Sequence, residues 1–153
     1  MAISVFKNAV CIIGTSAAPS TFMWRNVRTI TMNHRQEILD YTAMGSSGKK
    51  RLFGLKDVSL AIEFNQEYST GASLGAAQNS LDYYLNSYLG KESSAVWISI
   101  KPTTATCSKS NPRYAGRYML ESYNPMTGAP TDLGVVTANF IADGNIARKT
   151  TGM

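Results

Sequence analysis

Strict alternation of apolar and polar side chains from Asp57 to Phe64 is the feature that most constrains the fold of this chain. The apolar phase consists of Val58, Leu60, Ile62 and Phe64, and the intervening residues are Asp57, Ser59, Ala61 and Glu63. Successive side chains of a strand point to opposite faces, so this pattern predicts a strand with one buried and one polar face. We therefore expect a sheet that packs on a core through one face only.

Further segments that alternate, or that are rich in β-branched residues, surround this strand and predict a mainly β fold. They cover residues 3–13, 24–32, 37–42, 96–100, 114–121 and 133–141. One helix is expected over residues 74–88, where apolar side chains recur at helical spacing, and Gly90 can end it. Its apolar stripe should pack on the sheet. The residues predicted for the shared core are Leu60, Ile62, Phe64, Leu81, Leu85, Val136 and Phe140.

The connection before the alternating strand, residues 43–54, is too long for a tight hairpin turn, which usually takes about two to five residues. Long connections in compact domains are commonly functional. This one combines the basic run Lys49, Lys50 and Arg51 with the apolar pair Leu52 and Phe53. Apolar residues have little reason to occur in a solvated loop, so we expect these residues to contact a neighbouring subunit. The alternative is a plain surface loop whose charges face water.

The length and composition fit one domain that spans residues 1–153 and buries its own core. Residues 142–153 form a polar C-terminal tail by composition. The net charge of +5, from 15 basic and 10 acidic residues, permits a nucleic-acid partner without requiring one. We find no signal peptide and no apolar run long enough to cross a bilayer, so no membrane partner is expected.

Residues suited to catalysis or metal binding are scarce in this sequence. His34 is the only histidine, so a catalytic triad would have to be built on it, and we expect a surface or interface role instead. Cys11 and Cys107 are isolated, and both are expected to stay reduced. The segment GSSGKK is not a phosphate-binding loop, because Lys50 stands where serine or threonine is required. We therefore predict a protein that is not an enzyme and that binds no metal or cofactor.

The order of these elements resembles that of the major tail tube proteins of long-tailed bacteriophages. Residues 37–64, with DYTAMG, the basic loop and GLKDVSLAIEF, and residues 132–148, which end in FIADGNIAR, carry the resemblance. The expected helix lies between these two segments. The resemblance implies a β-sandwich or small barrel flanked by one α-helix, with a long inter-strand loop and extended termini.

The same resemblance implies a structural protein of the virion tail that is assembled in the host cytoplasm. Copies of it would form hexameric rings that stack into a hollow tube, enclose a tape-measure protein, contact other tail proteins and let double-stranded DNA pass. No residue is catalytic in that scheme. The mildly polar face of the alternating strand suits the wall of such a passage. We expect the lumen to be lined by Thr29, Thr31, Ser59, Ala61 and Glu63.

Three other interpretations remain open at this point. The first is another tail component, such as a terminator, or the tube protein of a related contractile or secretion machine. The second is a monomeric ligand-binding β-barrel, which would require a large apolar pocket. The third is an enzyme, against which the scarcity of catalytic groups argues.

Overall fold

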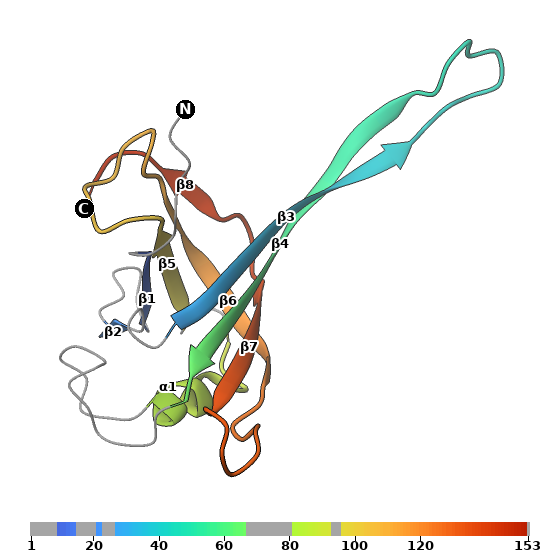
Figure 1. Ribbon diagram of the computed structural model, residues 1–153. Helices are drawn as coiled ribbons and strands as arrows, with labels where there is room; N and C mark the ends of the chain where they lie inside the picture. Colours follow the sequence, from blue (N-terminus) through green and yellow to red (C-terminus); the bar gives the residue numbers. More distant parts are fainter. Residues whose placement is uncertain (1–8, 15–20, 23–26, 67–80, 93–95, 153) are drawn as a thin grey trace.

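The computed structural model describes residues 9–14, 21–22, 27–66, 81–92 and 96–152, which build an antiparallel sheet with one short helix (Figure 1). The elements are β1 (Val10–Gly14), β2 (Thr21–Phe22), β3 (Val27–Asp40), β4 (Arg51–Asn65), α1 (Leu81–Tyr88), β5 (Trp97–Lys101), β6 (Arg113–Tyr123), β7 (Val135–Ala142) and β8 (Ala147–Lys149). The parts of the expected strands at residues 3–8 and 24–26, and of the expected helix at 74–80, lie outside the described residues.

The sheet is a single curled layer. Its strands follow the order β2-β1-β5-β6-β7-β4-β3, and β8 pairs with the first part of β6. The curl brings β3 towards β6, so that the ring centroids of His34 and Tyr114 lie 5.8 Å apart. The predicted mainly β class with one helix is confirmed. Where a sandwich or small barrel was expected, the described strands make one open sheet, with β2 and β3 at its two edges.

One face of the sheet and the helix share a single hydrophobic core. Every residue predicted for this core is buried, with a relative exposure of at most 1%. Tyr118 joins them from β6 and packs edge-on against Phe140, with ring centroids 6.5 Å apart. Just beyond α1, Leu89 makes a main-chain bridge to Leu120 of β6. The alternation predicted this core correctly, because a strand with a period of two can bury its apolar phase in only one way.

The hairpin of β3 and β4 is longer than the sequence predicts, and it leaves the body of the sheet (Figure 1). The expected strands 24–32 and 37–42 belong to one strand, because the polar residues between them stay paired, as Arg35 is with Asp57. β4 begins at Arg51, so the connection covers residues 41–50 in place of 43–54. Cross-strand pairing extends both strands, and no local pattern reveals it. We call the projecting part of the hairpin, residues 36–56, the arm.

A β-bulge lies at the base of the arm. Gln36 pairs with Lys56 and Ile38 with Phe53, so β4 carries one more residue than β3 between these pairs. Gly54 lies in the bulge, where a Cβ atom would come within 2.7 Å of the Glu37 carboxylate. The Gln36 side chain donates a hydrogen bond of 2.7 Å to the Gly54 carbonyl oxygen. Because a bulge bends and twists its strand, this position helps to set the direction of the arm.

The C-terminal segment that is polar by composition contains a further strand. β8 lies within residues 142–153 and pairs antiparallel with β6, with Lys149 opposite Arg113. Ile146, immediately before β8, is 6% exposed and packs over Gly116, where a Cβ atom would collide with its side chain. One buried side chain and a short ladder of backbone pairs thus place a segment that composition alone assigns to a tail.

Candidate assembly surfaces

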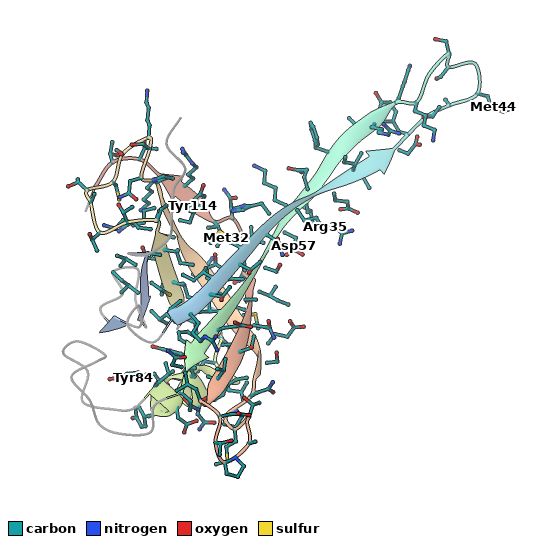
Figure 2. The ribbon with its side chains drawn as sticks, viewed as in Figure 1. Met32, Arg35, Met44, Asp57, Tyr84 and Tyr114 are labelled. Carbon is teal, nitrogen blue, oxygen red and sulfur yellow. The ribbon has the colours of Figure 1, made fainter. Side chains whose placement is uncertain are left out.

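The arm exposes large apolar side chains along its whole length, and Met44 stands at its tip (Figure 2). Phe53 is 80% exposed and Leu55 is 82% exposed. The other exposed apolar residues of the arm are Ile38, Leu39, Tyr41 and Leu52. A two-stranded hairpin is marginally stable alone, and contiguous exposed apolar surface marks interaction sites. The arm therefore has the surface of a contact between molecules.

These apolar residues occupy both faces of the arm. Ile38 pairs with Phe53, and Leu39 pairs with Leu52. Paired residues of an antiparallel ladder share a face, and consecutive residues lie on opposite faces. Leu52 and Phe53, which the sequence predicts as a joint contact, therefore point in opposite directions. The sequence analysis did not predict Ile38 and Leu39 as contact residues. The signal that could have identified them is that they form an apolar pair like Leu52 and Phe53, which they face across the hairpin.

The tip of the arm has its own hydrogen bonds. The backbone N–H and the hydroxyl of Thr42 donate to Asp40 Oδ1 at 2.9 and 2.6 Å, and Thr42 Oγ1 accepts from the Lys50 N–H at 2.9 Å. The hydroxyl bond first, and the backbone bond second, hold the pKa of Asp40 below its ordinary value. Lys49 and Lys50 are exposed in this loop, and Arg51 begins β4. The predicted basic run is thus placed at the free end of the arm.

The outer face of the sheet, turned away from the core, is polar where β3 and β4 run side by side. The residues expected at a passage wall share this face, as the register shows: Thr29 lies opposite Glu63, Thr31 lies opposite Ala61, and Ser59 is in phase with them. The structure therefore brings together all the residues proposed for this role.

β7 adds residues to this polar face that the sequence did not single out. Thr137 and Asn139 lie next to β4 on the outer face, and the Asn139 side chain donates to Ser122 Oγ at 2.8 Å. The pattern of residues 133–141 carries the signal, because Thr137 and Asn139 occupy the phase that its apolar residues leave free.

Charged side chains on this shared face of β3, β4 and β7 are few. Outside the arm they are Arg35, Asp57 and Glu63, and Glu37 continues the same phase of β3 into the arm; no lysine on these three strands is in phase with them. Figure 2 shows Arg35 and Asp57 along the hairpin where the arm leaves the sheet. Arg35 is thus the one basic group in this phase, and it pairs across the strands with Asp57, so the face offers little positive charge to bind phosphate.

Groups suited to catalysis do not converge in the part of the chain that the structure describes. No group of three or more His, Cys, Asp or Glu residues there could hold a metal ion. Cys11 and Cys107 are buried and reduced, as expected, and burial raises the pKa of Cys11 to about 12. His34 is exposed, with its Nε2 3.2 Å from the sulfur of Met32. In the part of the chain that the structure describes, no helix is long and apolar enough to cross a membrane.

A cavity of about 570 Å³ opens between β3 and the neighbouring ends of β5 and β6. Val27, Ile30, Met32, Ile100 and Tyr114 give it an apolar wall, to which Arg28, His34 and Lys101 add polar groups. Met32 and Tyr114 are labelled in Figure 2. Its volume lies in the range of small-molecule sites, so the cavity is a feature that suits a ligand binder.

Comparison with known proteins was made by sequence and by structure. No family model and no curated protein matches the sequence. A chain from the tail of an empty gene transfer agent particle with C6 symmetry superposes with a TM-score of 0.62 at 13% identity, over 90% of this chain and 94% of that chain. A chain of the sheath–tube complex of an extracellular contractile injection system, PVC, gives 0.63 at 14% identity, over 98% and 93%.

A chain in the baseplate structure of the anti-feeding prophage also superposes, with a TM-score of 0.57 at 8% identity over 100% of this chain and 99% of that chain. All these identities are low, so the likeness concerns the fold. It extends over nearly the full length of each chain, which a chance match of a few strands would not do. The resemblance to tail tube proteins that the sequence indicates is thus confirmed at the level of the fold, which this chain shares with components of phage-like tails and contractile injection systems.

Proposed function

We propose that this chain is the tube subunit of a phage-like tail, a structural protein of the particle with no enzymatic role. Copies associate into hexameric rings, and the rings stack into a hollow tube. The shared fold supports a tail role, and the similar gene transfer agent tail has C6 symmetry. The observation that carries the proposal is the arm, which is apolar on both faces and projects from a body whose core is complete without it.

The shape of the subunit supports an open stack. The arm lies at one end of the molecule, and in this proposal it docks on a different patch of another copy (Figure 1). A contact between two different patches repeats indefinitely instead of closing, as a filament requires. Within a ring, β3 is the edge strand of the sheet, and a neighbouring copy that continues the sheet there covers its free backbone groups.

In this proposal the polar outer face lines the lumen, with Thr29, Thr31, Ser59, Ala61 and Glu63 at its wall. Basic residues at the wall would bind phosphates and slow the passage of double-stranded DNA. The charges on the face are Arg35, Glu37, Asp57 and Glu63, so DNA and a tape-measure protein would meet a polar surface with a slight excess of acidic groups. The basic residues of the chain then serve contacts between subunits.

Electron microscopy of the purified protein tests this function. The wild-type chain is expected to form rings or tubes, because exposed apolar arms favour association. The double variant Leu52→Ser with Phe53→Ser should stay folded by circular dichroism but give monomers or single rings. The matched control, Leu52→Met with Phe53→Tyr, keeps apolar surface at both positions and should form tubes. Normal tubes from the serine variant would refute the role of the arm.

The likeness to the sheath–tube complex favours one variant of this function, the tube of a contractile or injection machine. The two cases differ in whether a sheath surrounds the tube. Native particles captured with an antibody against this chain should show either a bare tube or a sheathed tube in cryo-electron micrographs.

The cavity beside β3 favours a second candidate function, a monomeric ligand-binding protein. Arg28 and Lys101 on its wall would suit an amphiphile with an acidic head. Native mass spectrometry of the purified protein distinguishes the two: a monomer with a bound small molecule supports the ligand binder, whereas an unliganded oligomer supports the tube.

A further inference from the structure

The described part of the molecule has two distinct ends. β4 and β6 both pair antiparallel with β7, so they run in the same direction, and the arm and the start of β6 point towards one end (Figure 1). The opposite end holds α1, residues 89–92 and the loop of residues 124–134. Figure 2 shows Met44 and Tyr84 at these two extremes. We call them the arm end and the helix end.

The arm end is basic. The arm carries four basic and two acidic residues: Lys49, Lys50, Arg51 and Lys56, with Glu37 and Asp40. The neighbouring segments 101–114 and 143–149 contain one acidic residue, Asp143, and five basic residues, Lys101, Lys109, Arg113, Arg148 and Lys149. Two such ends facing each other would repel, so a partner surface for the arm needs the opposite sign.

The helix end is apolar and acidic. Residues 81–92 and 124–134 contain three acidic residues, Asp82, Glu92 and Asp132, and one basic residue, Lys91. Large apolar side chains exposed there are Tyr83, Leu89, Met126 and Leu133, of which Met126 is 81% and Leu133 is 69% exposed. The same combination of exposed apolar surface and charge occurs on the arm, with the charge reversed.

Hydrogen bonds join the two segments of the helix end. The Tyr123 hydroxyl donates to Asp82 Oδ1 of α1 at 2.8 Å. The side-chain amide of Gln66, just after β4, donates to the Tyr123 hydroxyl at 3.0 Å and to the Pro125 carbonyl oxygen at 2.8 Å. The helix and the loop are therefore held together as one surface at the end of the sheet.

We propose that the helix end of one copy is the docking site for the arm of the next copy in the stack. This inference rests on the proposed tube function and adds the identity of the receiving surface. Burial of exposed Phe53 and Leu55 against Met126 or Leu133 supplies apolar contact, at about 25 cal/mol per Å² removed from water. The opposite charges select the orientation, because an arm that meets another arm end faces like charge. The stack is therefore head to tail.

Charge reversal with complementation tests the proposal. The first variant, Lys49→Glu with Lys50→Glu, reverses charge in the exposed tip loop. The second, Glu92→Lys with Asp132→Lys, reverses exposed charge at the helix end. Each alone should lower the amount of pelletable tube about tenfold or more, the effect of roughly 1.4 kcal/mol at each repeated contact. All four changes in one chain should restore tubes, because both partners have then exchanged sign.

The matched control reverses two acidic residues outside the helix end, Glu121→Lys with Asp143→Lys, and should assemble as the wild type does. Circular dichroism and thermal melting verify that every variant is folded. Normal tubes from either two-residue variant, or no recovery in the combined variant, would overturn the docking site while leaving the tube function intact. Absence of rings and tubes from the wild-type chain would instead overturn the tube function itself.

Discussion

The two halves of β4 carry similar apolar residues in different surroundings. From Val58 to Phe64 the apolar side chains are at most 3% exposed, whereas Leu52, Phe53 and Leu55 are at least 55% exposed. In the body, α1 and the other strands cover the apolar phase of β4. In the arm, none of the described residues covers it. The same kind of side chain therefore stabilises the folded subunit in one half and remains available for association in the other.

The largest effect is expected from truncation in the body. Leu81→Ala removes a fully buried side chain that packs α1 on the sheet, so it should lower the free energy of unfolding by about 2–5 kcal/mol. Chemical or thermal unfolding of the unassembled subunit measures this. Phe53→Ala on the arm is the matched truncation, and it should change stability by less than about 0.5 kcal/mol. Equal effects of the two changes would show that the arm contributes as much as the body to the stability of the subunit.

The second largest effect is expected from alkaline pH, which should lower the free energy of unfolding of the body. Burial raises the pKa of Cys11 and of Tyr88 to about 12, and burial followed by the nearby Cys11 also raises the pKa of Tyr118. Between the ordinary and the raised pKa, the unfolded chain has lost protons that the folded chain keeps, so stability falls as pH rises above about 9. Cys11 alone contributes up to about 1.4 kcal/mol per pH unit. Urea unfolding at a series of pH values should show a shallower fall for Cys11→Ala.

A smaller effect on stability, but a large one on assembly, is expected from the two faces of the arm. Ile38→Ser with Phe53→Ser changes one face, and Leu39→Ser with Leu52→Ser changes the other. Each should leave the unfolding free energy within about 1 kcal/mol, because the side chains are exposed. If both faces contact neighbours, each variant should fail to form tubes in electron micrographs. Normal tubes from one of them would show that this face stays in solvent.

The smallest structural effect is expected at the outer face. Thr29→Lys with Ser59→Lys should leave folding and assembly unchanged, because both side chains are exposed outside the core and the two positions do not pair with each other. If the face lines the lumen, added lysines should make tubes retain DNA at low salt and release it as salt rises. Co-sedimentation of DNA with tubes measures this, with Thr104→Lys and Ser110→Lys on the loop after β5 as the control. Equal DNA retention by both variants would show that the outer face does not line the lumen.

The sequence predicts the body better than the arm, and the reason is physical. Leu60, Ile62 and Phe64 follow a local period, which is enough to assign them to a core. The length of the arm depends on pairs such as Arg35 with Asp57, which join polar residues across the hairpin without a local signal. The opposite orientation of Leu52 and Phe53 follows only once both are placed in a strand.

The two oppositely charged ends of the molecule could not be predicted from the sequence either. Glu92 and Asp132 are forty residues apart in the chain, and the fold brings their segments to the same end of the sheet. The polar outer face shows the intermediate case: the sequence predicts Thr29 and Glu63 for one surface, and only the register places them opposite each other. Composition gives the overall charge of +5, but only topology gives its direction.

The register of the sheet also has a consequence for how the chain folds. Asp40 pairs with Arg51 across a short connection, whereas Val10 pairs with Lys101 across most of the protein. Contacts that are close in sequence form earlier than distant ones, because closing a long loop costs more entropy. The arm hairpin is therefore expected to form on the nascent chain before β1 can close the body. During synthesis, the association surface therefore precedes the core, and exposed arms can meet one another before the last strands pair.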